Sequence, residues 1–447
     1  MYSVLLLMAL ALDPWQQTAK DIFRQLIEIN TQDSDGDVTK ASNAMAQRFR
    51  KAGWDEKDIA VVGDVARRKS MVVRYRGTGK RKPILIVAHL DCVEAKREDW
   101  RTDPFQLIEI DGQYYGRGTV DDKNMASAFV ANFLRYKSEG FQPDRDLILA
   151  LTAGEESHID NGISYLIAKR RDLIEAAFAI NEVGGAQMLN GKKLFVGAEA
   201  AEKSFITFHL TTKNAGGHSS VPSKDNAIYH LAMALTKLQA YEFPPRLTEV
   251  TQAYFERMAS IVGGATGRDM SLVPDKAAMA RLSQSPFYNA QLRTTCVVTM
   301  INGGHAQNAL PQAADATVNC RALPGDTIDS VQKTLADVVA DPAVAITQFD
   351  EVTIAPASTL SDDAMAPIRA TAAEMWPGIP VIPTMLSGGT DGRYLRKAGI
   401  PTYGVNGLFL EQSENRLHGR DERVPVASYF ESQEFLYRLV KKLGSTL

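Results

Sequence analysis

Short apolar runs that end in acidic or imidazole side chains constrain this chain of 447 residues more than any other feature. Each run is long enough for a buried strand, and the runs span residues 83–88, 147–153, 176–180 and 400–405. The first is followed directly by His89, and the second by Gly154 and the acids Glu155 and Glu156. The third is followed by Asn181 and Glu182, and the fourth precedes the segment that leads to His418. Because ligands of open α/β sheets collect at the carboxyl ends of strands, these side chains are candidates for one functional site.

Helical patterns alternate with these strands. Apolar residues recur at helical spacing in segments 15–31, 43–52 and 125–136. Strands that alternate with helices predict an α/β domain, here with a central mixed sheet.

The stretch 203–356 follows a different pattern. It alternates as strand, helix, strand, strand, helix and strand, in segments 205–212, 227–238, 294–301, 316–321, 331–340 and 343–349. That order predicts a two-layer α+β sandwich inserted into the α/β domain. The α/β domain would then consist of residues 1–202 and 357–447, and the segment 244–290 would be a largely helical insertion within the sandwich.

Charge and cysteine content exclude some classes of function and of metal site. The formal net charge is −3 and no basic run is present, so a dedicated nucleic-acid binder is not expected. Three scattered cysteines are too few for a disulfide framework or a cysteine zinc site. Any metal ion would therefore be held by His, Asp and Glu.

The N-terminus allows two interpretations. The apolar run Val4–Leu12 is too short to span a bilayer, which needs about 20 apolar residues, and no other stretch predicts a membrane span. We interpret residues 1–12 as the remnant of an export signal, which predicts a periplasmic or secreted protein. The alternative is a buried N-terminal segment in a cytoplasmic protein.

The polar residues at the strand ends have ordinary explanations when taken singly. His89 and Asp91 could form a polar strand end, and Asp121 in GRGTVDDK could cap a helix. Glu182 could be a solvated loop acid. Taken together, however, they supply the oxygen and nitrogen ligands that a hydrolytic metal site requires.

In this order and spacing the motifs resemble the M20 family of dinuclear-zinc peptidases and deacylases. The resemblance covers nearly the whole chain and rests on ILIVAHLDCV, GRGTVDDK, TAGEE, NEVGG, LHGRDERV and, in the insert, NAGGHSSVPSKDNAI and NALPQAADATVNCR. It implies two Zn²⁺ ions per chain, with Co²⁺ or Mn²⁺ as possible substitutes. His89, Asp121 and Glu182 would bind one ion. Asp121, Glu156 and His418 would bind the other, with Asp121 as the bridge.

The resemblance also implies how these residues act. Glu155 would be the general base that takes a proton from a metal-activated water, and Asp91 would orient the ring of His89. The family often has Asp-Met-Lys-Gly where this chain has DDKN at 121–124, and the differing positions 122 and 124 are not expected to touch a ligand.

The insert is expected to contribute groups that bind the substrate. By the same resemblance His218 would hydrogen-bond the tetrahedral oxyanion from a partner subunit, in a homodimer formed through the inserted lid domain. Asn308 and Arg321 would hold a substrate carboxylate, and Gly389 would lie in a turn against the substrate. Each has an alternative: a packing histidine for His218, a surface salt bridge for Arg321 and a plain turn for Gly389.

Two hypotheses of different classes follow. The first is a zinc-dependent exopeptidase, dipeptidase or N-acyl-amino-acid hydrolase that cleaves an amide bond next to a free carboxylate, with a small peptide or N-acyl amino acid as substrate. The second is a catalytically silent relative that binds peptides or metal. Loss of Glu155, Asp121 or His418 would favour the second hypothesis, but all three are present.

Overall fold

The chain divides into two compact units, each described by itself. The computed structural model describes residues 12–157, 160–349, 351–414 and 416–445, so nearly all of the expected signal segment 1–12 lies outside the described residues. The first unit comprises Met1–Ala198, Ser361–Val381 and Ile400–Leu447, and the second comprises Glu199–Leu360 and Ile382–Gly399. Among the described helices, none is long and apolar enough to cross a membrane.

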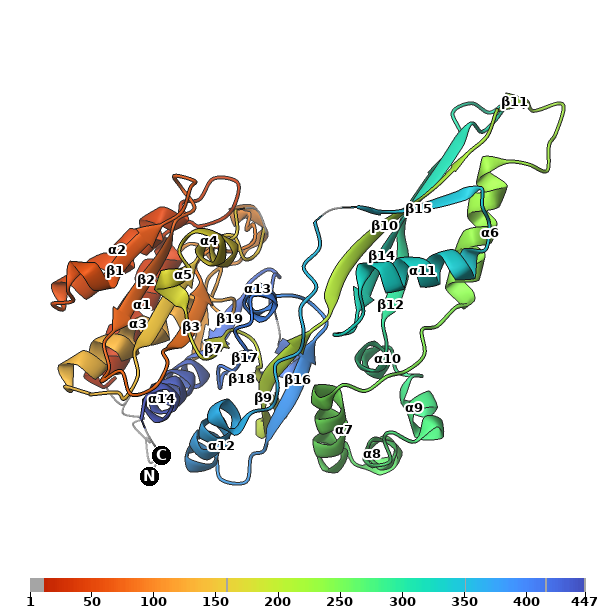
Figure 1. The fold of residues 1–447 in the computed structure, drawn as a ribbon. Helices are drawn as coiled ribbons and strands as arrows, with labels where there is room; N and C mark the ends of the chain where they lie inside the picture. The colour runs from red at the N-terminus through yellow and green to blue at the C-terminus, as the bar shows by residue number, and fades with distance from the viewer. Residues whose placement is uncertain (1–11, 158–159, 350, 415, 446–447) are drawn as a thin grey trace, which may run out of the picture. The chain divides into compact units, whose positions relative to one another are not determined.

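A mixed sheet forms the core of the first unit (Figure 1), and its strands follow the order β1-β2-β6-β3-β7-β17-β9-β8-β18. Their bounds are Ile59–Val62 (β1), Ser70–Tyr75 (β2), Ile84–His89 (β3), Leu147–Thr152 (β6), Ala179–Asn181 (β7), Ala186–Leu189 (β8), Lys192–Glu202 (β9), Thr402–Gly404 (β17) and Phe409–Glu411 (β18). The central strands β6, β3, β7 and β17 run parallel, whereas β1–β2, β2–β6 and β8–β9 are antiparallel pairs. Every residue of β3 and β6 is buried, as is typical of parallel strands covered on both faces. The predicted α/β fold with a central mixed sheet is confirmed.

Helices and a small sheet complete the first unit. The α-helices span Pro14–Glu28 (α1), Val38–Lys51 (α2), Lys123–Ser138 (α3), Gly162–Lys169 (α4), Arg171–Ile174 (α5), Asp362–Met375 (α12) and Val426–Leu443 (α14). Short 3₁₀ helices span Glu56–Asp58, Arg97–Asp99 and Gln412–Glu414, and the small sheet pairs Arg423–Pro425 (β19), Gln113–Tyr115 (β5) and Ile108–Ile110 (β4). Helix α2 begins earlier than residue 43, where the sequence predicted it, because the side chain of Asp37 accepts the Lys40 N–H and caps it.

The second unit is built on a sheet in the order β12-β14-β10-β15 with two helices on one face. Its strands and these helices span Ser204–Lys213 (β10), Ala227–Ala240 (α6), Thr295–Gly303 (β12), Ala313–Ala322 (β14), Ile328–Val339 (α11) and Val344–Phe349 (β15). Buried Phe208, Val318, Leu231 and Leu335 lie in the core between sheet and helices. The order of elements is therefore the β-α-β-β-α-β order expected for this part of the chain.

Further elements lie around this sandwich. Four helices fill the region expected to be helical: Glu249–Val262 (α7), Gly264–Ser271 (α8), Lys276–Leu282 (α9) and Pro286–Leu292 (α10). The remaining elements are the short pair Gly217–His218 (β11) and Ala309–Leu310 (β13), the strand Val381–Leu386 (β16) and the helix Gly392–Lys397 (α13). Cys296 on β12 and Cys320 on β14 are register partners and form one disulfide, although three scattered cysteines pointed to no disulfide framework.

The limits of the second unit differ from the expected 203–356. The unit begins at Glu199, ends at Leu360 and also takes in Ile382–Gly399, which was expected in the α/β domain. A buried ion-pair cluster explains the difference. The guanidinium of Arg396 on α13 lies 2.7 Å from Glu199 and 2.6 Å from Glu202, and it also donates to Ser358 Oγ at 3.1 Å.

Candidate metal centre

Three neighbouring parallel strands bring the predicted ligands to one edge of the first unit's sheet. β3 ends at His89, β6 is followed by Glu155 and Glu156, and β7 is followed by Glu182. Because β6, β3 and β7 are adjacent and parallel, their carboxyl ends meet at the same edge.

Asp121 lies between the two predicted metal-binding histidines. One carboxylate oxygen is 2.9 Å from His89 Nε2, and the other is 3.1 Å from His418 Nε2. Asp121 reaches this position from the turn before α3, and His418 from the loop between β18 and β19. A carboxylate with each oxygen facing a different imidazole is placed as a bridge between two cations would be.

The other two acids complete the two predicted ligand groups. Glu182 Oε2 lies 3.4 Å from His89 Nε2, and Glu156 Oε2 lies 3.1 Å from His418 Nε2. The predicted ligands are therefore brought together, although they are spread over more than 300 residues of sequence. Glu155, next to Glu156, is buried at the same strand end.

The imidazole of His89 is held differently from what was expected of Asp91. His89 Nδ1 lies 3.0 Å from the backbone carbonyl oxygen of Asp91, and 3.8 Å from its carboxylate. The carboxylate instead accepts the N–H of Glu156 at 3.0 Å. Because a carbonyl can only accept, Nδ1 carries a proton toward Asp91, and Nε2, which faces Asp121, is the nitrogen that would bind a metal ion.

Opposite charges determine how the central groups titrate. Burial alone would lower the pKa of His89, but the carboxylates of Glu182 and Asp121 raise it well above its ordinary value. Hydrogen bonds to Asp121 and Glu156 raise the pKa of His418 to about 10. Burial would raise the pKa of Asp121, but His418 and His89 hold it below its ordinary range. The site therefore favours positive charge at both imidazole positions.

Asp122 is a member of the cluster that the sequence analysis did not expect. Ligand atoms of His89, Asp122 and Glu182 all lie within 4.8 Å of one another, as do those of His89, Asp121 and Glu156. Burial, followed by the charge of Glu182, raises the pKa of Asp122 well above its ordinary value. Position 122, which was not expected to touch a ligand, thus lies close to His89 and Glu182, and the signal in the sequence was its place directly after Asp121.

The donor set fits divalent cations. Acid groups outnumber imidazoles in the cluster, and buried oxygens Glu156 Oε1 and Asp122 Oδ2 have no hydrogen-bond partner among the described residues. Buried carboxylates this close together repel one another unless cations or protons lie between them. Nitrogen and oxygen ligands of this kind suit zinc, and a carboxylate that offers two oxygens suits a pair of ions.

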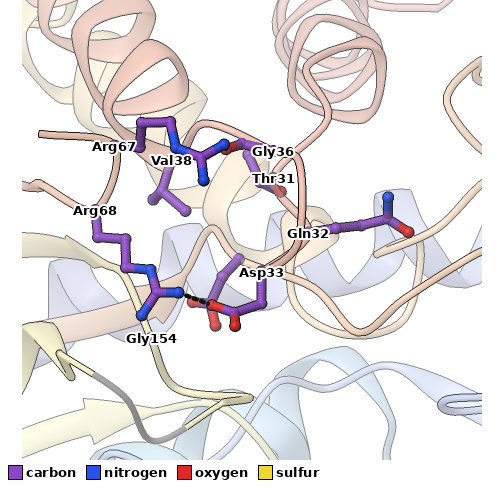
Figure 2. A pocket seen from close by; sticks show the side chains of 9 residues that line it. Thr31, Gln32, Asp33, Gly36, Val38, Arg67, Arg68 and Gly154 are labelled. Carbon is purple, nitrogen blue, oxygen red and sulfur yellow. Dashed lines mark hydrogen bonds and ion pairs between the residues drawn. The ribbon is translucent and has the colours of Figure 1, made fainter.

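Nearby arginines already have partners of their own (Figure 2). A narrow cavity beside Asp91 is lined by Thr31, Gln32, Asp33, Gly36, Val38, Arg67, Arg68, Asp91 and Gly154. In it Arg68 forms ion pairs with Asp33 and, at 3.2 Å, with Asp160, while Arg67 donates to the carbonyl oxygen of Gly36 at 3.1 Å. These two guanidinium groups are thus directed to other partners than the acids of the metal centre.

The second unit places its predicted substrate-binding residues in two groups. Strands β11 and β13 set His218 opposite Ala309, and the N–H of Ser219 donates to the carbonyl oxygen of Asn308 at 3.1 Å. His218 and Asn308 are therefore neighbours, and Figure 1 shows β11 at the tip of this unit.

Arg321 contacts the turn that carries Gly389. Its guanidinium lies 4.6 Å from the centroid of the Phe205 ring and donates to the carbonyl oxygen of Ser387 at 3.4 Å. Burial and the nearby charge of Arg393 lower the pKa of Arg321. A Cβ added at Gly389 would lie 2.2 Å from Arg393 Nη1, so only glycine fits that position without displacing the guanidinium.

Comparison with known proteins matches most of the chain to the family that its motifs resemble. Residues 85–442 match the model of peptidase family M20/M25/M40. A probable carboxypeptidase S-like protein of Dictyostelium discoideum is 29% identical over 83% of this chain and 74% of its own length. The N-fatty-acyl-amino acid synthase/hydrolase of Bos taurus is 30% identical over 80% of this chain and 74% of its own length.

Solved structures share the fold at low sequence identity. An M20 family metallo-carboxypeptidase of Sulfolobus solfataricus superimposes with a TM-score of 0.70 at 16% identity, over 97% of this chain and 100% of the other. A dinuclear metal-binding peptidase of family M20 from Bacillus subtilis has a TM-score of 0.64 at 12% identity, over 97% and 99%. Because the family model covers most of the chain, the protein belongs to peptidase family M20/M25/M40 and is a hydrolase of the peptidase and amidohydrolase class.

Proposed function

We propose that this protein is a dinuclear zinc hydrolase that cleaves an amide bond next to a free carboxylate. The observation that carries the proposal is the place of Asp121, whose two oxygens each face one imidazole, that of His89 or that of His418. Glu182 and Glu156 extend this arrangement on either side. His89, Asp121 and Glu182 would hold one ion, and Asp121, Glu156 and His418 the other. Zinc is the expected metal, with Co²⁺ or Mn²⁺ as possible substitutes.

Different residues of the chain would have different roles in the reaction. When bound, the two ions activate water and stabilise the developing negative charge on the substrate oxygen. Glu155 takes a proton from the attacking water and transfers it to the nitrogen of the leaving amine. Its neighbour Glu156 lies against His418, which leaves the two adjacent acids with different tasks. The products are a carboxylic acid and an amine.

The second unit would select the substrate by its carboxylate. Arg321 and Arg393 lie close enough for the charge of one to lower the pKa of the other, and both adjoin the turn that carries Gly389. A guanidinium binds both oxygens of a carboxylate at once, which suits the free end of a peptide or an N-acyl amino acid. We propose that Arg321 holds this carboxylate, with Asn308 of the partner subunit, which lies beside His218, as a second donor. His218 would donate to the oxyanion.

The relatives support small amide substrates of two kinds. One relative is described as carboxypeptidase-like and the other as a synthase and hydrolase of N-fatty-acyl amino acids. Both descriptions name or imply an amide next to an amino-acid carboxylate. A panel of dipeptides and N-acyl amino acids of increasing acyl length separates the two kinds of substrate by their kcat/KM.

We further propose a homodimer formed through the second unit. Strand β12 lies at the edge of its sheet and exposes Val297, Met300 and Ile301, and the neighbouring helix α6 exposes Tyr229 and Met233. An exposed apolar edge strand is a surface that a second chain commonly covers.

Metal analysis tests the proposed function. We expect about two Zn²⁺ ions per chain after loading with zinc, loss of amide hydrolysis with a chelator, and recovery when zinc is added back. The recovery is the control that separates metal loss from denaturation. A zinc content near zero together with hydrolysis that a chelator does not change would contradict the proposal.

A further inference from the structure

A buried ion pair beside the metal centre has no part in the proposed chemistry. Arg117 Nη1 lies 2.5 Å from Glu422 Oε2, and the side chains are 3% and 0% exposed. A buried ion pair is weak support for stability, because desolvation of both charges offsets most of their attraction. What distinguishes this pair is the set of backbone groups that it binds.

The carboxylate of Glu422 organises the turn that carries Asp121. It accepts the N–H groups of Gly118 at 3.0 Å, of Val120 at 2.6 Å and of Asp121 itself at 3.1 Å. Three donors of one loop, all within residues 118–121, thus converge on a single buried anion. Because Glu422 fixes the main chain of Asp121 directly, it fixes the point from which the bridging carboxylate extends.

The guanidinium of Arg117 holds the loop of His418. Its Nη2 donates to the carbonyl oxygen of Gly419 at 3.0 Å, one residue after His418. His418 has a φ of 61°, a left-handed conformation that a residue with a side chain adopts only when its surroundings hold it. The same guanidinium also reaches the carbonyl oxygen of Glu94 at 3.4 Å.

We propose that Arg117 and Glu422 are positioning residues that set the spacing between Asp121 and His418. These two ligands come from loops about 300 residues apart in sequence, and the buried pair is bonded to the main chain of both. The inference rests on the proposed function. The affinity for the zinc ion that Asp121 and His418 would share should therefore depend on Arg117 and Glu422.

Zinc affinity of the variant Glu422→Gln tests the proposal. An amide offers one acceptor oxygen in place of two and turns an N–H₂ group toward N–H donors, so the turn can no longer be held in the same way. We expect the affinity for at least one of the two ions to fall by about 10- to 100-fold. The measurement is competition with a chromophoric chelator, at a temperature where circular dichroism shows the variant to be folded.

Phe49→Leu is the matched control for a loss of stability. Phe49 packs against Trp54, with ring centroids 5.0 Å apart, and Trp54 packs against Tyr75. Tyr75 pairs with Leu147, the first residue of β6, whereas Glu155 follows the opposite end of that strand. This variant should lower the melting temperature and keep the zinc affinity of the wild type.

Arg117→Lys gives a second test that does not depend on the folding of Glu422→Gln. Lysine keeps a positive charge for Glu422 but lacks the planar fork that also reaches Gly419. We expect about a 10-fold loss of affinity for one zinc ion. Wild-type affinity for both ions in folded Glu422→Gln or in Arg117→Lys would overturn the proposal. A wild-type protein that binds no zinc would overturn the proposed function, and this inference with it.

Discussion

At the scale of single residues, the charge states in the metal centre are determined by neighbouring charges more than by burial. Burial works against the ionised form of Asp121, yet two imidazoles hold its pKa below the ordinary range. Hydrogen bonds to Asp121 and Glu156 in turn raise the pKa of His418 to about 10. Each group is therefore kept charged by its neighbours, and a divalent ion would take the place of the imidazole proton.

Glu155→Gln should separate metal binding from catalysis. The change removes a base and keeps the shape of the side chain, so both zinc ions should remain. Because general-base catalysis contributes about 10²- to 10⁴-fold, kcat should fall by that order. Steady-state kinetics and metal analysis of the same preparation measure both quantities, and an unchanged kcat would show that another group is the base.

At the scale of elements, one buried arginine joins α13 and β9 to the turn that carries Gly389. Arg396 binds Glu199 and Glu202, and Glu202 in turn accepts the N–H of Thr390 at 2.8 Å and its hydroxyl at 2.7 Å. The segment containing Gly389 is thus anchored by hydrogen bonds from Thr390 to Glu202, whose buried carboxylate is paired with Arg396.

Arg396→Met should lower the free energy of unfolding by about 3–5 kcal/mol, because two carboxylates are left buried without their cation. The control is Arg369→Met on α12. Arg369 lies 2.6 Å from Asp362, the same distance as Arg396 from Glu202, but both members of this pair are exposed. That control should change stability by less than about 1 kcal/mol. Denaturant unfolding monitored by circular dichroism measures both values, and equal effects would refute the role of burial.

The packing of α14 on α3 should depend on pH through Glu139. Burial would raise the pKa of Glu139, but hydrogen bonds from Tyr437, Arg135 and Lys441 lower it from 4.5 to about 2. A lowered pKa means that the contribution to stability is complete above about pH 4.5 and is lost as the pH falls toward 2. Glu139→Gln should therefore melt below the wild type at pH 7, and the difference should shrink at pH 3. A difference that stays constant between these pH values would contradict this assignment.

At the scale of the whole molecule, the ladder of the second unit separates its two groups of substrate-binding residues. Strands β10 and β14 pair from Ser204 and Ala322 at one end to Lys213 and Ala313 at the other, and Arg321 is one residue from the first end. The eight residue steps from Phe205 to Lys213 extend over about 27 Å, and His218 lies beyond the far end. This separation supports the proposal that Arg321 and His218 of one chain serve different active sites.

Mixing two inactive variants should test this arrangement. His218→Ala should lower the rate by about 10²- to 10³-fold, because one donor to the oxyanion is lost. A heterodimer of His218→Ala with Glu155→Gln regains one complete site, so mixed samples should recover part of the activity. Each variant alone is the control. Samples that have demonstrably exchanged subunits and remain inactive would rule out the arrangement across subunits.

The sequence by itself determined the features that depend on local pattern. Buried strands such as 84–89 and 147–152 were predictable because apolar runs of that length leave few alternatives, and a residue directly after a strand must lie at the sheet edge. For this reason His89, Glu156 and Glu182 could be expected together before any coordinates. The motifs around them also identified the family.

Only the tertiary structure decided contacts between residues far apart in the chain. The partners Arg117 and Glu422 are 305 positions apart, and no periodicity links them. No sequence pattern links Arg396 to Glu199 either, although this pair ties the segment around Arg396 to the second unit. The disulfide between Cys296 and Cys320 likewise depends on strand register. Hydrophobic patterning determines which face of an element is buried, whereas the pairing of buried charges depends on where distant loops meet after packing.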